Sequence, residues 1–181
     1  MIGKWRRIAF LAIPLAAVLG LAGCINQAPA EPSRRYGDAP DFVGIDGWIN
    51  SPPLTIAGLR GKVVLVEFWT HQCINCMRVL PHTVKWHRHY KDQGLVVIGV
   101  HTPETESEAR PEAVQAAIRK FGIEFPVALD DRFTTWEAYG AQAWPTTYLI
   151  DRRGTIIRKH IGEGEYDETE AAIRKALETK G

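Results

Sequence analysis

Apolar residues recur along this chain in two alternating patterns. Residues 62–69 (KVVLVEFW) and 95–100 (LVVIGV) are almost continuously apolar, which is typical of strands that are buried on both faces of a sheet. Between them, the apolar side chains of residues 76–90 recur at helical spacing, with basic residues on the opposite face. The pattern predicts a strand, a helix and a second strand parallel to the first.

The second half of the chain repeats this alternation. Residues 111–121 form a predicted helix that begins with a proline and is followed by Gly122, the usual end signals of a helix. Further predicted elements are a strand at 125–129, a short helix at 133–139, and strands at 146–150 and 155–161 joined as a hairpin by the turn DRRG. Asp167 and Glu170 are spaced as a capping box for a final helix. The predicted fold class is α/β, with a parallel core followed by a hairpin and a helix.

Two further segments precede this core. Residues 48–50 and 54–56 are short strand-like runs separated by SPP, and we expect them to form an N-terminal β-hairpin. Residues 24–40 are rich in proline and polar residues and show no hydrophobic period, which predicts a flexible tether. The expected folded domain therefore spans residues 41–181.

The first 23 residues have the pattern of a signal peptide. Basic residues near the start are followed by an uncharged apolar run that is too short and one-sided for a secure membrane span. The run ends in LAGC, which resembles the lipobox of bacterial lipoproteins. This resemblance implies cleavage before Cys24 and lipidation of its thiol, which would anchor the protein to a bilayer at the extracytoplasmic side of the cell envelope. The alternative is an ordinary signal peptide or anchor with an incidental cysteine.

Composition narrows the function classes. A chain of 181 residues that is 45% hydrophobic supports one domain with a sizeable core. Its 22 basic and 21 acidic residues nearly cancel, so no charge pattern indicates binding to nucleic acid. If Cys24 carries lipid, the three cysteines reduce to one pair, Cys73 and Cys76. Export would place that pair where disulfides persist.

The two cysteines form a CINC motif between a predicted buried strand and a predicted helix. A structural zinc site usually needs two such pairs, and the chain has no second pair. A helix N-terminus favours the thiolate of Cys73, which is the nucleophilic form. Cys76 follows one turn later and is within reach to resolve a mixed disulfide. This context indicates redox catalysis, and an inert structural disulfide is the alternative.

Several motifs together resemble one known family. The segment FWTHQCINCMR at residues 68–78 looks like a thioredoxin active-site segment. CINC, VIGVHTPE (97–104), WPTTYLID (144–151) and HIGEGEYDETE (160–170) resemble the DipZ-like branch of the TlpA family of extracytoplasmic thioredoxin-like proteins. The resemblance covers residues 41–181. It implies a central mixed sheet flanked by helices, a central insertion of one strand and one helix, and thiol–disulfide exchange without a cofactor or metal.

The resemblance also implies roles for single residues. Glu67 matches a buried acid that moves a proton to or from the resolving cysteine, and burial of a carboxyl group in an apolar strand raises its pKa toward neutrality. A structural Glu67 paired with Lys62 is the alternative. Pro145 matches the family's cis-proline, which would present the Trp144 backbone to an extended substrate segment, and an ordinary trans proline is the alternative there. Trp69 is assigned to the same substrate-binding surface.

The expected partners are exported proteins that contain disulfides, with a membrane thiol-electron donor by family analogy. Reduction of substrates is the expected direction. One rival function is copper delivery, although copper-delivering relatives have three residues between their cysteines. Another is thiol peroxidase activity, for which Thr70 fits the motif but Val66 stands where proline is required.

Three polar residues near the motif stay without an assigned role. His71 could stabilise the Cys73 thiolate as a cation, or it could be an exposed histidine without a function. His101 and Glu104 follow the second buried strand, where we expect them to cap a loop.

Overall fold

The computed structural model describes residues 36–179. The predicted signal peptide, Cys24 and most of the predicted tether lie outside this range. The described chain contains one six-stranded sheet with the strand order β1-β4-β3-β2-β5-β6. Its strands are β1 (Gly47–Ile49), β2 (Val63–Trp69), β3 (Leu95–His101), β4 (Val127–Leu129), β5 (Thr146–Ile150) and β6 (Ile156–Ile161). Its helices are α1 (Ile74–Tyr90), α2 (Pro111–Phe121), α3 (Thr134–Ala138) and α4 (Tyr166–Glu178), with short 3₁₀ helices η1 (Ala57–Leu59) and η2 (Lys91–Gln93).

The sheet is mixed, as predicted. β3 runs parallel to both β2 and β4, whereas β1, β5 and β6 pair antiparallel to their neighbours. Since α2 and β4 lie between β3 and α3 in the chain, they account for the expected insertion of one helix and one strand. The α/β class and the β5–β6 hairpin are confirmed.

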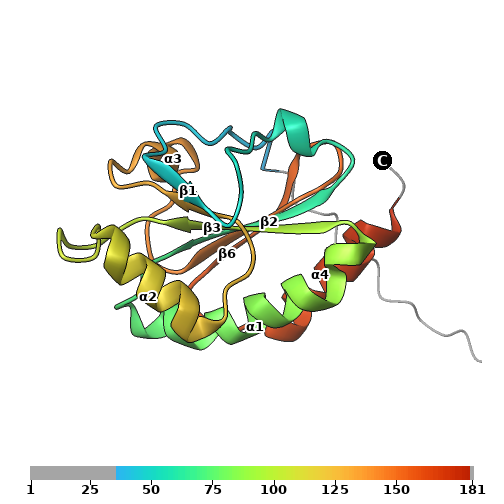
Figure 1. Ribbon diagram of the computed structural model, residues 1–181. Coiled ribbons are helices and arrows are strands. Elements are labelled where there is room, and N and C mark those ends of the chain that lie inside the picture. The colour runs from blue at the N-terminus through green and yellow to red at the C-terminus, as the bar shows by residue number, and fades with distance from the viewer. Residues whose placement is uncertain (1–35, 180–181) are drawn as a thin grey trace, which may run out of the picture. The chain divides into compact units, whose positions relative to one another are not determined.

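Helices cover both faces of the sheet. The helices α1, α2 and α4 lie on one face, and α3 lies on the other (Figure 1). Alternate residues of β2 face these two layers, so that Leu65 packs in the cluster beneath α1 while Val66 packs in the cluster that includes Trp136 of α3. Every residue of β2 is therefore buried, which explains why its sequence is continuously apolar instead of alternating.

The predicted N-terminal hairpin is wrong. β1 pairs with β4, and residues 54–56 form no strand. The chain turns away at Asn50, which has a left-handed φ of 66° and whose side-chain amide donates to the backbone carbonyls of Ile123 and Phe125. Two prolines follow shortly afterwards and supply no backbone N–H for a returning strand.

The final helix is confirmed, but its predicted capping box is not. No side chain caps the N-terminus of α4. Glu170 instead accepts hydrogen bonds from the Trp86 Nε1 (3.3 Å) and the Tyr90 hydroxyl (2.8 Å). Its carboxylate therefore ties α4 to α1, because a tertiary partner replaces the local backbone partner that the spacing predicted.

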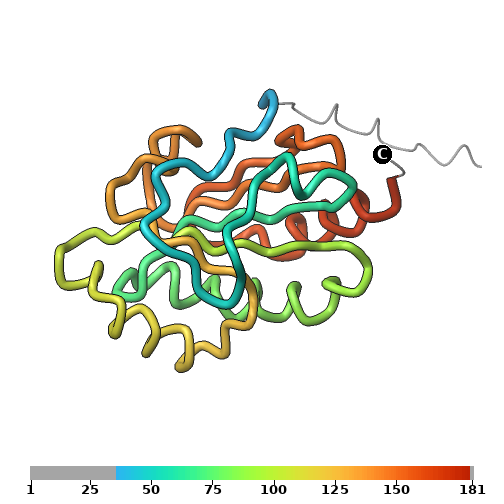
Figure 2. Tube along the Cα trace, turned by 45° about the horizontal axis from the view of Figure 1, so that its top comes forward, coloured from blue at the N-terminus to red at the C-terminus, as the bar shows by residue number. Residues whose placement is uncertain are grey.

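The end of the predicted tether belongs to the folded domain. The backbone N–H of Tyr36 donates to Ile156, and that of Ala39 donates to Gly154. Figure 2 shows this blue start of the described chain beside the orange β5–β6 hairpin. Residues 36–39 are therefore held by backbone hydrogen bonds, so the predicted tether boundary at residue 40 is too late.

Candidate active site

The cysteine pair lies where β2 ends and α1 begins. Cys73 is the N-cap residue of α1, and its Sγ accepts a hydrogen bond of 3.2 Å from the backbone N–H of Cys76. Cys73 is partly exposed, whereas Cys76 is completely buried. A helix N-terminus directs free N–H groups at this position, which suits a negatively charged sulfur. Of the two sulfurs, that of Cys73 is therefore the more accessible from outside the domain.

Cys76 is held as a neutral thiol by its surroundings. Burial raises the pKa of this thiol strongly, and the hydrogen bond with Cys73 raises it further. The negative charge of Glu67 adds to the same effect. Since only the thiolate is nucleophilic, Cys76 needs a base to remove its proton before it can attack.

Glu67 is placed to be that base. It lies in the centre of β2, is 1% exposed, and accepts a hydrogen bond from the Thr83 hydroxyl of α1. Burial raises the pKa of Glu67 from 4.5 to about 7, although the Thr83 hydrogen bond opposes the increase. Its Oε1 has no partner among the described residues, so the alternative of a Glu67–Lys62 pair is not what the structure shows. A carboxyl group that titrates near neutrality can both accept and return a proton.

The peptide bond between Trp144 and Pro145 is cis, which confirms the expected geometry. Pro145 directly precedes β5, whose first residue pairs with Phe68 near the end of β2. Its carbonyl accepts a hydrogen bond of 2.8 Å from Gly162 in the β6–α4 loop. The cis peptide bond between Trp144 and Pro145 therefore lies at the same end of the sheet as the cysteine loop.

The side chain of Trp144 is engaged within the domain. Its Nε1 donates to the carbonyl of Thr102 over 3.0 Å, and its ring stacks on Trp136 with 4.1 Å between ring centroids. These contacts fix the position of residue 144.

Trp69 does not have the surface position that was expected of it. Its side chain is 0% exposed and packs in the same core cluster as Cys76. Gly99 on β3 makes room for it, because a Cβ atom there would lie 2.8 Å from the Trp69 Nε1. Trp69 is part of the core cluster against which Cys73 packs. Its assignment as a substrate-contacting residue is therefore corrected. The exposed apolar residue at the site is Ile74, between the cysteines, which is 57% exposed.

Two site residues were not assigned from the sequence. Thr83, which holds Glu67, is recognisable only as a hydroxyl residue on the apolar face of a predicted helix. His101 contacts His71 through a ring-nitrogen distance of 3.2 Å. The expected loop-capping role belongs instead to Glu108, whose carboxylate accepts the backbone N–H groups of Glu104 and Thr105.

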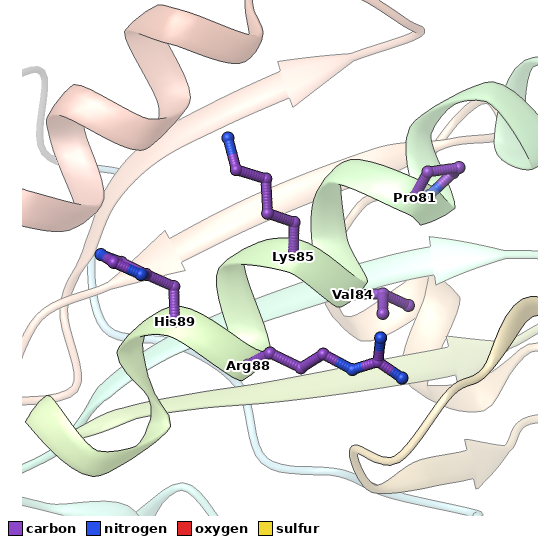
Figure 3. A pocket seen from close by; sticks show the side chains of 5 residues that line it. All are labelled: Pro81, Val84, Lys85, Arg88 and His89. Atoms are coloured by element: carbon purple, nitrogen blue, oxygen red, sulfur yellow. The ribbon is translucent and has the colours of Figure 1, made fainter.

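Other surface features lie away from this chemistry. A shallow depression along α1 is lined by Pro81, Val84, Lys85, Arg88 and His89 (Figure 3) and includes neither cysteine. Within residues 36–179, no three His, Cys, Asp or Glu side chains are grouped to hold a metal ion. The helices of this same range are all too short or too polar to cross a membrane.

Comparisons with known proteins agree with this geometry. A model of the AhpC/TSA family matches residues 37–159. Protein DipZ of Mycobacterium tuberculosis is 44% identical over 171 residues, which cover 88% of this chain but 25% of DipZ. The thiol–disulfide oxidoreductase ResA of Halalkalibacterium halodurans is 32% identical over 87% of this chain and 86% of its own length. A solved thiol–disulfide isomerase from Corynebacterium glutamicum, 31% identical, superposes with a TM-score of 0.71 over 78% of this chain and 98% of that structure.

Proposed function

Because the chain belongs to the AhpC/TSA family and is a thiol–disulfide oxidoreductase of thioredoxin-like fold, we propose that it exchanges disulfides with exported proteins through Cys73 and Cys76. The observation that carries this proposal is the arrangement of the two cysteines. Cys73 is partly exposed at the N-cap of α1, Cys76 is buried, and the backbone N–H of Cys76 donates a hydrogen bond to the sulfur of Cys73. The chain spans about a quarter of the length of the DipZ relatives that it matches, so the activity of those longer proteins supports no more than this exchange.

The reaction proceeds in two displacements. The Cys73 thiolate attacks a substrate disulfide, a bond forms between Cys73 and one substrate sulfur, and the other substrate sulfur leaves and takes a proton. Glu67 then accepts the Cys76 proton, and Cys76 attacks Cys73, which breaks the bond between Cys73 and the second substrate sulfur; that sulfur leaves and takes up the proton held by Glu67. The substrate leaves as a dithiol and the enzyme retains the Cys73–Cys76 disulfide, which a membrane thiol-electron donor would reduce again. The Trp144 backbone beside Pro145 would bind the extended substrate segment.

We propose reduction of the substrate as the direction of this exchange. Strongly oxidising relatives of this fold owe their potential to a stabilised thiolate in the reduced form. The measurement that decides the direction is the reduction potential of the cysteine couple. A value near −270 mV, about that of thioredoxin, would support a reductant, and a value near about −120 mV would reverse the proposed direction.

We further propose that the domain is lipid-anchored through Cys24. The described chain begins at the turn end of the β5–β6 hairpin, where Tyr36 pairs with Ile156. Pro145 and the paired residues Thr146 and Ile161 lie at the other end of that hairpin. Within residues 36–179, the first residue and the cysteine end therefore lie at opposite ends of this hairpin. Detergent phase partitioning of the wild type and of Cys24→Ala would test the anchor, since an unchanged partition would contradict it.

Two rival functions have weaker support. A thiol peroxidase motif requires proline at position 66, but Val66 pairs with both Ile98 and Tyr148 in the middle of the sheet, where proline would remove a ladder hydrogen bond. Copper delivery is disfavoured by the spacing of the cysteines, because two residues separate Cys73 and Cys76 whereas three separate the cysteines of the copper-delivering relatives.

The direct test is reduction of insulin by the purified protein with dithiothreitol as the electron source. Cys73→Ser should abolish the reduction above background, and Cys24→Ser should retain it as the matched cysteine control. Wild-type activity no greater than that of Cys73→Ser would refute the exchange function. Turnover of hydrogen peroxide in place of insulin would favour the peroxidase.

A further inference from the structure

Two histidines form a contact beside the cysteine loop. His71 lies in the β2–α1 loop, two residues before Cys73, and His101 is the last residue of β3. His71 Nδ1 lies 3.2 Å from His101 Nε2, and the two rings are inclined by 16°. The contact follows from the sheet, because Trp69 and His101 pair in register at the ends of β2 and β3.

His101 is a neutral, immobilised member of this pair. It is 0% exposed and packs edge-to-face against Trp69. Burial, with a further contribution from His71, lowers the pKa of His101 to about 3, so it carries no charge in the physiological range. Its Nδ1 has no partner among the described residues. A buried polar atom without a partner is costly, and the polar contact that this imidazole makes through its other nitrogen is the one with His71.

His71 has one nitrogen held and one nitrogen free. When His71 is protonated, its Nδ1 carries a hydrogen, and the neutral Nε2 of His101 can accept it. The Nε2 of His71 makes no hydrogen bond within residues 36–179 and is not among the enclosed polar atoms there, so it faces accessible space. The pair therefore has the arrangement of a base whose ring is oriented by a second group.

Burial and a neighbouring charge act on the pKa of His71 in opposite directions. Burial lowers the pKa of His71, and the charge of Glu108 from the β3–α2 loop opposes that effect. Glu108 is 1% exposed and is held in place by backbone N–H groups of its own loop. The titratable groups that face His71 are therefore His101 on β3 and Glu108 on the β3–α2 loop, with Cys73 following on its own loop.

We propose that His71 accepts the proton of the Cys73 thiol and that His101 is a positioning residue that holds His71 in the required orientation. In the first displacement, the proton moves from the Cys73 Sγ to the His71 Nε2, and the thiolate then attacks the substrate disulfide. The Cys73 thiolate supplies the electron pair of the new bond to one substrate sulfur while the substrate disulfide bond breaks. The departing sulfur keeps the electron pair of that broken bond and takes the proton from His71, so charge and protons balance. The proposal rests on the proposed exchange function and assigns its first proton transfer, as Glu67 serves the second.

The test compares the pH dependence of Cys73 reactivity in four variants of the full chain. The rate of Cys73 alkylation by iodoacetamide is measured from pH 5 to pH 9 in reduced protein, alongside insulin reduction at pH 7. His71→Asn should remove the inflection that His71 imposes on the alkylation profile and should slow insulin reduction by about ten- to a hundredfold, the lower part of the range for general acid–base catalysis. His89→Asn, at the other end of α1, is the matched histidine control and should change neither quantity.

The variants of His101 separate positioning from packing. His101→Phe fills the buried site without an acceptor and should reproduce most of the His71→Asn profile, whereas His101→Gln keeps an acceptor oxygen and should restore the wild-type profile. Near-UV circular dichroism identifies any variant that fails to fold, in which case His71→Asn alone decides. An unchanged profile in His71→Asn, or equal profiles in the two folded His101 variants, would overturn the proposal. If wild-type protein fails to reduce insulin while His71→Asn still alters alkylation, the exchange function fails and the histidine pair stands.

Discussion

Replacement of Glu67 by glutamine should stabilise the folded protein at neutral and alkaline pH. The perturbation is nearly isosteric, and the carboxamide oxygen of glutamine can still accept the Thr83 hydroxyl. The substitution removes a carboxyl group whose pKa is raised by burial. In the unfolded chain Glu67 ionises near its ordinary pKa of 4.5, and in the folded protein its pKa is about 7.

The sign and size follow from proton linkage. Between these two pKa values the unfolded state has lost the proton that the folded state still binds, so the free energy of unfolding falls as pH rises. The loss begins near pH 4.5 and is complete above pH 7. At about 1.4 kcal/mol for each unit of pKa, the total is roughly 3 kcal/mol. Below pH 4.5 Glu67 contributes no such penalty.

Urea unfolding of wild type and Glu67→Gln with dithiothreitol, from pH 4 to pH 8, measures this contribution. The free energy of unfolding of the variant should rise by about 3 kcal/mol relative to that of the wild type between pH 4 and pH 8. Burial lowers the pKa of His101 to about 3, so His101 destabilises the fold as pH falls below 6.5, but this effect is common to both proteins and cancels in the difference. A difference that stays constant with pH would refute a buried, pKa-raised Glu67. The same variant should resolve mixed disulfides more slowly near pH 7, because it has lost the base.

Three other substitutions test separate parts of the site. Cys76→Ser should trap a covalent substrate adduct on non-reducing gels, and its absence would count against a resolving role. Thr83→Val removes the hydrogen bond that lowers the pKa of Glu67, so the pH midpoint of single-turnover resolution should move upward; an unmoved midpoint would disconnect the two residues. Gly99→Ala places a Cβ atom 2.8 Å from the Trp69 Nε1 and should cost about 1–3 kcal/mol in urea unfolding, whereas Gly47→Ala in the same sheet should cost less because its nearest neighbour is 3.4 Å away.

Elements with a strong apolar pattern could be predicted from the sequence almost to the residue. β2 and β3, whose residues are nearly all buried, and α2, which buries one face, agree with the expected ranges within one residue at each end, because burial dictates their apolar pattern. The N-terminal hairpin and the capping box failed for a different reason. β1 pairs with β4, about 80 residues away, and Glu170 bonds to α1. A local pattern contains no information on which distant partner competes for a strand or a carboxylate.

The site shows the same division between local and distant information. The cysteines were predicted from their motif between a strand and a helix, whereas the roles of Glu67 and Pro145 were predicted from the resemblance to thioredoxin-like proteins. The structure shows that Glu67 is buried and that the Trp144–Pro145 bond is cis. Trp69 was misplaced because nothing local distinguishes a tryptophan that faces the substrate from one that enters the space left by Gly99. The contact between His71 and His101 could have been predicted from the sequence. Both residues follow buried strands that were predicted to be parallel, and parallel neighbours end at the same edge of a sheet. The strand pairing brings these two rings together, and the burial of His101 then determines which of them can carry a proton.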